Sequence, residues 1–286
     1  MKWNDRRLRF RAVLDGNRCI KPASVFDPLS IRSAEALGYE VGMFAGSIAS
    51  LVVVGAPDLA VITLSELAEQ VLRLTRAAGL PLLIDADHGY GNAINVCRTV
   101  EELEVAGAAA LTIEDTYLPA AYANKGKNRL ISIEEGVGKM RAALASRHDV
   151  SLSIVARTSA ADASSLDETI ARAKAYEAAG VDAIFITSPK CRADIAEISS
   201  AVGLPLILSP NPELLTDMDF LNSCRVRIAL EGHLPYMAAV NTVYEVMKQL
   251  RAGTRVSAAP PSVELFRALT KNDKYQRMGL DFLGGE

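Results

Sequence analysis

The sequence is poor in several features, and each scarcity excludes a class of protein. Of its 286 residues only 4 are cysteine, and these stand far apart as Cys19, Cys97, Cys191 and Cys224. They lack the Cys-x-x-Cys spacing of zinc sites and the density of a disulfide scaffold, so we expect free thiols in a reducing cytoplasm. The chain has no apolar run long enough to cross a bilayer, and its first residues lack the apolar core of a signal peptide. We therefore expect a cytoplasmic protein without a membrane partner.

A strong charge of either sign is also absent. The 31 Lys and Arg residues are opposed by 34 Asp and Glu residues, which gives a formal net charge of -3, and both kinds are spread along the chain. Without a basic stripe that would attract phosphates, we expect no nucleic-acid partner. Apolar residues, in contrast, make up 50% of the chain, which is enough to bury one large core.

Short apolar runs alternate with longer amphipathic stretches, a pattern typical of repeated β/α units. Small-residue phrases such as AAGLPLLI and AAGVDAIFI mark the junctions from helix to strand. We expect five glycines to adopt the left-handed backbone conformation just after a helix, namely Gly38, Gly79, Gly107, Gly180 and Gly203. Candidate strands lie near residues 20–25, 41–46, 81–86, 109–114, 152–157, 183–187, 205–208 and 226–230.

Eight such units predict an α/β fold of the TIM type, a (β/α)₈ barrel over residues 1–253. An open doubly wound sheet is the alternative architecture. After Gly253 the sequence SAAPPS interrupts the pattern, so residues 254–286 are expected to form a C-terminal helical extension that packs on the barrel or on a neighbouring subunit. Within it we expect a helix from Val263 to Met278.

Acidic residues end two of the expected strands, at the face where a barrel places its active site. Asp85 and Asp87 stand in DADHGYG at the end of the third strand, where alternation along the strand should turn both to one face, and Glu114 ends the fourth. Adjacent carboxylates repel each other unless a cation lies between them, and an all-oxygen set suits Mg²⁺ or Mn²⁺. Ion pairs with Arg or Lys are the alternative. His88 could serve as a base or ligand, but a buried histidine oriented by a carboxylate is the better interpretation.

Other strand ends offer groups for an anionic substrate. Arg157 follows LSIVA, and its guanidinium matches a substrate carboxylate, with pairing to nearby acids alone as the alternative. Gly46 and Ser47 end the second strand, where backbone N–H groups could hold carboxylate oxygens or simply form a turn. His233 follows the eighth strand and could donate to a substrate carboxylate or a developing enolate, unless it only caps a helix.

One connection is long. The stretch TYLPAAYANKGKNRLI, residues 116–131, is predicted to be either a lid over the site or a solvated surface loop.

Five elements of the sequence resemble the isocitrate lyase/phosphoenolpyruvate mutase superfamily. In order, they are PASVFDPLSIRSAEALGYE, GAPD, DADHGYGN, LTIEDT and IVART. The resemblance extends over most of the barrel, from Pro22 to about Gly253. It implies an enzyme in which a small 2-oxo acid chelates a bound Mg²⁺ through its carboxylate and keto oxygens.

The resemblance also implies a role for each candidate residue. The metal site would consist of Asp85, which binds Mg²⁺ directly, and of Asp87, Glu114 and Asp58, which hold its water molecules. Gly46 and Ser47 would hold the substrate carboxylate, and Arg157 would neutralise the oxyanions of the substrate. The eighth helix, from about Leu234 to Arg251, would be exchanged between paired subunits of a homo-oligomer, commonly a tetramer built as a dimer of dimers.

Departures from the family pattern bear on the reaction. ANKGKNRLIS lacks the KKCGH sequence that supplies the lyases with a cysteine acid, which disfavours cleavage of isocitrate or methylisocitrate. The phosphonopyruvate branch is disfavoured because Ala45 stands where serine is frequent and Ser159 replaces the aspartate of ARTDA.

With His233 in EGHLPYMAA, the chain looks most like the oxaloacetate decarboxylase branch. This implies Mg²⁺-dependent decarboxylation of oxaloacetate to pyruvate and CO₂ through a metal-stabilised enolate, with Arg157 and His233 as catalytic residues. The alternatives are another member that cleaves a C–C or P–C bond, similar to methylisocitrate lyase or phosphonopyruvate hydrolase, and a non-catalytic protein that binds a 2-oxo acid.

Overall fold

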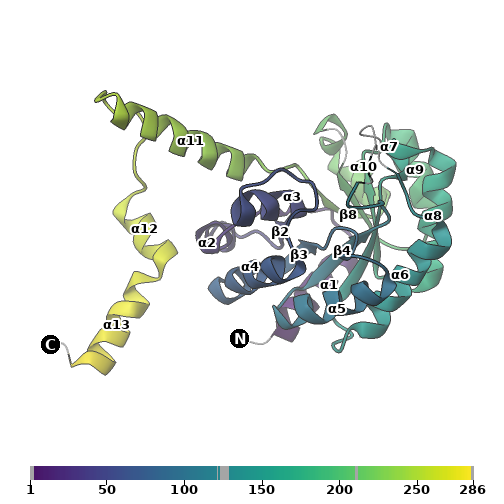
Figure 1. The fold of residues 1–286 in the computed structure, drawn as a ribbon, viewed down its shortest axis with the longest axis horizontal. Helices are drawn as coiled ribbons and strands as arrows, with labels where there is room; N and C mark the ends of the chain where they lie inside the picture. Colours follow the sequence, from purple (N-terminus) through teal and green to yellow (C-terminus); the bar gives the residue numbers. More distant parts are fainter. Residues whose placement is uncertain (1–2, 121, 123–128, 210–211, 285–286) are drawn as a thin grey trace.

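Eight parallel strands form the centre of the molecule (Figure 1). The structure is a computed structural model that describes residues 3–120, 122, 129–209 and 212–284. Each strand pairs with the next one along the chain. The strands are β1 (Ala23–Ser24), β2 (Gly42–Phe44), β3 (Leu82–Asp85), β4 (Ala110–Glu114), β5 (Ser153–Thr158), β6 (Ala183–Thr187), β7 (Leu206–Ser209) and β8 (Val226–Ala229).

The sheet closes through the residues that precede β1. Ile20 forms a parallel bridge with Ile228 of β8. The Ile20 N–H donates to the Arg227 carbonyl at 2.9 Å, and the Ala229 N–H donates to the Ile20 carbonyl at 2.9 Å. Because the strand order never reverses, the open doubly wound alternative is wrong and the predicted (β/α)₈ barrel is confirmed. All eight predicted strand positions are confirmed as well.

Helices cover the outside of the barrel (Figure 1). The strand residues are almost all buried, which explains why their sequences are apolar runs rather than alternating patterns. Several helices begin at a capping box, for example at Asp27, Thr63 and Asn92. The helices up to β8 are α1 (Trp3–Asp15), α2 (Pro28–Ala36), α3 (Gly46–Ala49), the π-helix η1 (Ser50–Val54), α4 (Leu64–Ala77), α5 (Ala93–Val105), α6 (Ile133–Ser146), α7 (Ala160–Ala163), α8 (Leu166–Ala179), α9 (Arg192–Ala201), the 3₁₀ helix η2 (Pro212–Leu215) and α10 (Met218–Ser223).

The glycine prediction is only partly confirmed. Gly38, Gly107 and Gly180 have φ values of 81°, 92° and 95°. At Gly79 and Gly203 it is wrong, because the preceding residue already leaves the helix in an extended conformation. The N–H groups of these two glycines instead donate to glutamate side chains of neighbouring helices.

The C-terminal part of the chain leaves the barrel as an arm (Figure 1). Helix α11 (Leu234–Arg251) has the predicted bounds but no buried residue. The single helix expected from Val263 to Met278 is wrong: α12 (Val263–Thr270) and α13 (Asn272–Leu283) are separated by Lys271, whose φ of 56° ends the first helix. The arm contacts the barrel again where Lys271 Nζ donates to the Ala77 carbonyl at 2.8 Å.

All four cysteines are free, as predicted. Among the helices that the structure describes, none combines the length and apolar character needed to cross a membrane.

Candidate active site

A cavity of about 220 Å³ lies at the carboxyl ends of the strands, the end of a barrel that carries active sites. We call it the mouth cavity. The predicted carboxylates and Arg157 all line it, together with small and apolar residues from the adjoining loops. The complete lining is Asp58, Ala60, Asp85, Asp87, Glu114, Thr116, Leu118, Arg157 and Ser159. Residues from distant parts of the sequence therefore come together at the carboxyl ends of the strands, as their positions in the sequence predicted.

Arg157 joins two of the acids. Its NH1 atom lies 2.7 Å from Asp85 Oδ2, and its Nε atom lies 3.3 Å from Glu114 Oε2. The register of β4 and β5 places Arg157 directly opposite Glu114. Burial disfavours the cation, but the charges of Asp85 and Glu114 outweigh burial and raise the pKa of Arg157. Pairing with nearby acids, given above as the alternative role, is thus present, while the side chain also faces the cavity.

The two aspartates of DADHGYG reach the cavity by different routes. Asp85 is the last residue of β3, and its Oδ1 atom accepts from Thr112 Oγ1 at 3.1 Å. Asp87 lies beyond the strand in a left-handed conformation with φ of 46°, so strand alternation is not the reason that both face the same cavity. A Cβ atom at Gly46 would lie 2.4 Å from Asp87 Oδ1, so a larger residue at this position would have to displace the carboxylate.

The mouth cavity carries more negative than positive charge. Four carboxylates and one guanidinium line it. Burial, followed by the charges of Asp85 and Glu114, raises the pKa of Asp87 to about 8. Burial and the charge of Asp85 also raise the pKa of Asp58. Raised pKa values of this kind indicate acids without enough positive charge beside them, and an all-oxygen donor set that lacks positive charge fits a divalent cation such as Mg²⁺.

The acids do not form a closed cage. Among the described residues, no three His, Cys, Asp or Glu side chains come close enough together to hold a metal ion directly. A site with one direct carboxylate and others that bind the metal's water molecules does not need such a cage, and Mg²⁺ commonly keeps several waters. The side chains therefore fit the arrangement that the resemblance implies.

Of the residues predicted to hold the substrate, Arg157 lines the mouth cavity, whereas Gly46, Ser47 and His233 are not part of its lining. The Gly46 N–H points to Asp85 Oδ2 at 3.4 Å, and Ser47 follows it in α3. His233 precedes α11, and its Nδ1 atom lies 2.9 Å from Ser24 Oγ. Burial lowers the pKa of His233, whereas the charges of Asp85 and Asp58 oppose that effect.

His233 occupies the N-cap position of α11, as the alternative role predicted, but its side chain makes no capping hydrogen bond. Sequence reasoning missed Ser24, because a serine in a strand of two residues gives no pattern.

His88 is buried as predicted, but no carboxylate in the described part of the chain forms a hydrogen bond with its ring. Its ring Nδ1 atom has no hydrogen-bond partner among the described residues. Burial and the charge of Lys139 lower the pKa of His88 to about 4. The imidazole is therefore neutral near pH 7, which argues against a role as a cation.

Both ends of the long loop are ordered by backbone contacts. The Tyr117 N–H donates to the Arg129 carbonyl at 2.7 Å, and Thr116 bridges to Leu130. The ANKGKN sequence between them, residues 123–128, lies outside the described residues, and so does the prediction of a lid or a surface loop there.

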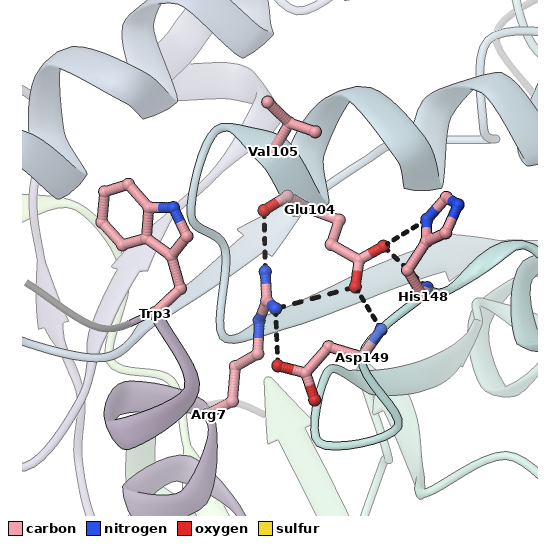
Figure 2. Close-up of a pocket in the computed structure, with 6 residues that line it drawn as sticks. All are labelled: Trp3, Arg7, Glu104, Val105, His148 and Asp149. Carbon is pink, nitrogen blue, oxygen red and sulfur yellow. Dashed lines mark hydrogen bonds and ion pairs between the residues drawn. The ribbon is translucent and has the colours of Figure 1, made fainter.

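A second hollow, of about 430 Å³, lies at the opposite end of the barrel (Figure 2). It is lined by Trp3, Arg7, Glu104, Val105, His148 and Asp149. Figure 2 shows Arg7 beside both acids. Its NH1 atom lies 2.8 Å from Asp149 Oδ2 and 3.6 Å from Glu104 Oε1. Backbone N–H groups of His148 and Asp149 also bind Glu104. Because these acids already have partners, we interpret this hollow as structural.

The fold and the mouth cavity together define a (β/α)₈ barrel whose strand ends carry an acidic site with one arginine. A family model described as Phosphoenolpyruvate phosphomutase matches residues 10–251. The chain therefore belongs to the phosphoenolpyruvate phosphomutase family, and the resemblance found in the sequence is confirmed.

Similar proteins include both curated relatives and solved structures. A protein of Rhodopseudomonas palustris (strain BisB18) named "Oxaloacetate decarboxylase" is 53% identical over 291 residues, which cover 99% of each chain. A phosphonopyruvate hydrolase complex with oxalate and Mg²⁺ is 29% identical, has a TM-score of 0.84, and matches over 97% of this chain and 99% of the other. Oxaloacetate acetylhydrolase with the inhibitor 3,3-difluorooxalacetate is 25% identical, has a TM-score of 0.86, and matches over 99% and 98%.

Proposed function

We propose that this protein is a carboxy-lyase that converts oxaloacetate to pyruvate and CO₂ with the help of Mg²⁺. The observation that carries the proposal is the mouth cavity, where four carboxylates lie beside Arg157. Such a set suits a divalent cation and an anionic 2-oxo acid together. The high identity over the whole length to a relative named oxaloacetate decarboxylase supports the choice of substrate.

The metal site would use the acids of the cavity. Asp85 would bind Mg²⁺ directly, while Asp87, Glu114 and Asp58 would hold its water molecules, and Mn²⁺ could take its place. When bound, the ion supplies a Lewis acid for the 2-oxo group of the substrate. The excess of negative charge and the raised pKa of Asp87 support this assignment.

The remaining residues would bind and orient oxaloacetate. Arg157 would pair with charged oxygens of the substrate, which the surrounding acids would otherwise repel. The Gly46 N–H and the Ser47 hydroxyl would hold the C1 carboxylate, and His233 would donate a hydrogen bond to the reacting part of the substrate. When the C3–C4 bond breaks, its electron pair stays on the three-carbon fragment as the enolate of pyruvate, and water then protonates C3.

Another reaction of the family is the chief alternative. The similarity to phosphonopyruvate hydrolase favours cleavage of a P–C bond, and a methylisocitrate-type cleavage would use the same acids. Loss of CO₂ needs no acid at the bond that breaks, whereas the lyase reaction needs a proton donor at carbon. The loop sequence contains no cysteine to serve as that donor. A non-catalytic 2-oxo acid binder is the remaining alternative.

A substrate panel tests the proposal. Oxaloacetate, phosphonopyruvate, isocitrate and methylisocitrate are each incubated with purified protein and Mg²⁺, and product formation is followed. Because free Mg²⁺ also decarboxylates oxaloacetate, every rate is corrected by a protein-free blank at the same Mg²⁺ concentration. We expect turnover of oxaloacetate alone, and a fall in kcat/KM of more than about 100-fold in Asp85→Asn.

Asp5→Asn is the matched control, because this exposed aspartate lies in α1 at the other end of the barrel. It should keep the wild-type rate. Oxaloacetate turnover that equals the blank, or that survives in Asp85→Asn, contradicts the proposal. Turnover of any substrate in the panel excludes the non-catalytic alternative.

We further propose that the protein is a homo-oligomer, commonly a tetramer in this family, with α11 exchanged between paired subunits. Helix α11 buries none of its residues on its own barrel. A groove of about 860 Å³ lies beside β1, α2 and the start of α11, with apolar lining residues such as Phe26, Leu29 and Leu37. An α11 helix from a second copy would cover this groove.

Two broader expectations remain proposals. Residues 1–253 would form the catalytic domain, with 254–286 as an extension of it rather than a separate enzyme unit. The free cysteines support a cytoplasmic location.

A further inference from the structure

Lys139 is a buried cation that the proposed reaction does not use. It lies in α6 with 3% of its surface exposed. Its Nζ atom donates to the His88 carbonyl at 2.8 Å, and no described carboxylate forms an ion pair with it. A buried ammonium group is unfavourable unless its hydrogen bond or charge serves the surrounding structure. The His88 carbonyl is therefore the contact that needs an explanation.

This carbonyl belongs to a backbone segment of unusual conformation. Asp87 and Tyr90 have φ values of 46° and 59°, and the intervening Gly89 has 79°. Left-handed conformations are unfavourable for residues with a side chain and persist only where contacts enforce them. The segment carries Asp87, whose carboxylate lines the mouth cavity.

Three successive carbonyl groups of the segment are each held by a different element. The Glu114 N–H donates to the Asp87 carbonyl at 2.8 Å. Lys139 Nζ donates to the His88 carbonyl at 2.8 Å, and Thr99 Oγ1 donates to the Gly89 carbonyl at 3.0 Å. Strand β4 and helices α6 and α5 thus fix the backbone around Asp87. Of the three donors, Lys139 is the only charged one, and charged donors form the stronger hydrogen bonds.

We propose that Lys139 is a positioning residue that holds the backbone around Asp87 in the conformation that binds the divalent cation. This inference rests on the proposed function, since it assumes that the mouth cavity binds Mg²⁺. Two effects of Lys139 have opposite signs. Its positive charge near Glu114 and Asp115 would weaken the binding of another cation, whereas its hydrogen bond to His88 strengthens binding by fixing Asp87.

The sign of the change in affinity tests the proposal. Mg²⁺ binding to the full-length protein is measured by titration calorimetry without substrate, and Mn²⁺ binding by electron paramagnetic resonance. We expect Lys139→Met to raise Kd for both ions by about 10-fold or more, the range typical of residues that support metal ligands. Electrostatics alone predicts a lower Kd. Lys174→Met, at an exposed position of α8, is the control and should bind as wild type does.

A second variant separates positioning from charge and from folding. Thr99→Val removes the neighbouring hydrogen bond to the Gly89 carbonyl, keeps the shape of the side chain, and leaves Lys139 in place. We expect it to raise Kd for Mg²⁺ several-fold, with an unchanged near-ultraviolet circular dichroism spectrum. If Lys139→Met does not fold, Thr99→Val tests the positioning proposal in its place.

The outcomes are distinct. A folded Lys139→Met that binds Mg²⁺ as tightly as wild type, or more tightly, overturns the inference, as does an unchanged Kd in Thr99→Val where the lysine variant does not fold. A wild-type protein that binds neither ion overturns the proposed function itself.

Discussion

Gly46 shows how the backbone of one element limits the site carried by another. A Cβ atom at this position would lie 2.4 Å from Asp87 Oδ1. We expect Gly46→Ala to displace the Asp87 carboxylate and to lower kcat/KM for oxaloacetate by about 100-fold, the scale of a misplacement of about 1 Å. Steady-state kinetics at several Mg²⁺ concentrations measure the loss, and the apparent affinity for Mg²⁺ should fall with it.

Gly138→Ala is the control for this prediction. A Cβ atom at Gly138 in α6 would meet no atom within 4 Å. Alanine should therefore leave kcat/KM unchanged and raise the free energy of unfolding by roughly 0.5–1 kcal/mol, because it favours the helix. If the two variants behaved alike, the close approach of Gly46 to Asp87 would have no functional importance.

Ser24 bears on the role of His233. Ser24 Oγ lies 2.9 Å from His233 Nδ1, and this contact would leave Nε2 to face the substrate in the role proposed for His233. We expect Ser24→Ala to lower kcat for oxaloacetate about 10-fold and to weaken binding of oxalate, an enolate mimic, while Ser24→Thr keeps the hydroxyl and restores both. His233→Gln is the companion variant. Unchanged turnover and oxalate binding in His233→Gln would show that His233 has no role in the reaction.

At the residue scale, the sequence predicts which acids reach the site better than it predicts buried cations or backbone conformations. Asp85 and Glu114 could be predicted because they follow apolar strands, whose carboxyl ends share one face of a barrel. Lys139 could not, because a lysine in an amphipathic helix normally lies in solvent. The conformation of Asp87 was also out of reach, since neighbouring elements impose a positive φ on it.

Helix α1 covers the end of the barrel opposite the mouth cavity. Arg7 donates to the Glu104 carbonyl at 2.7 Å and to the Ala108 carbonyl at 3.1 Å, in addition to its contact with Asp149 (Figure 2). We expect Arg7→Met to lower the free energy of unfolding by about 3 kcal/mol, because it leaves buried acceptors without a donor. Urea denaturation at pH 7 measures the change, and Arg141→Met, at an exposed position of α6, should show almost none.

The effect of Arg7 should depend on pH. Burial opposes ionisation of Asp149, but hydrogen bonds from Ser151 and Arg7 outweigh it and lower its pKa. A carboxyl group with a lowered pKa in the folded state contributes stability above its unfolded pKa of about 4 and loses it as the pH falls toward the folded value. The gap in stability between wild type and Arg7→Met should therefore narrow below about pH 4. A gap that stays constant there would mean that Asp149 contributes nothing to it.

At the element scale, strands were easier to predict than the helix that closes the barrel. Strands buried on both faces leave continuous apolar runs, so their number and positions follow from the sequence. Helix α1 contacts α4 and α5 partly through arginine side chains, which donate to backbone carbonyls near the C-terminal ends of these helices; Arg6, for example, donates to the Thr75 carbonyl. Its sequence therefore lacks a clear apolar pattern. The break at Lys271 was missed because lysine rarely adopts a left-handed conformation.

Helix α11 carries apolar side chains that its own barrel does not bury. Exposed apolar side chains recur along this helix at intervals of mostly three residues, namely at Leu234, Met237, Val240, Val243, Tyr244, Met247 and Leu250. Contiguous exposed apolar faces are unusual on monomers, so this one supports the proposed subunit interface. A contact with a second copy cannot be predicted from the pattern of one chain, and the family resemblance alone suggested the proposed exchange of this helix.

Charges placed in the middle of this apolar face should separate the subunits. We expect the double variant Val243→Glu, Met247→Glu to change a homo-oligomer, a tetramer by family resemblance, into monomers, because each buried glutamate would have to leave water without a partner. Light scattering coupled to size-exclusion chromatography measures the mass. Thr242→Glu adds a charge on the other side of α11 and should leave the assembly intact. Since the groove beside β1 and Ser24 would then be uncovered, the double variant should also lose part of its oxaloacetate turnover while retaining its helical circular dichroism. A wild-type monomer would show that the arm has another purpose, and a double variant that stays oligomeric would place the subunit interface elsewhere.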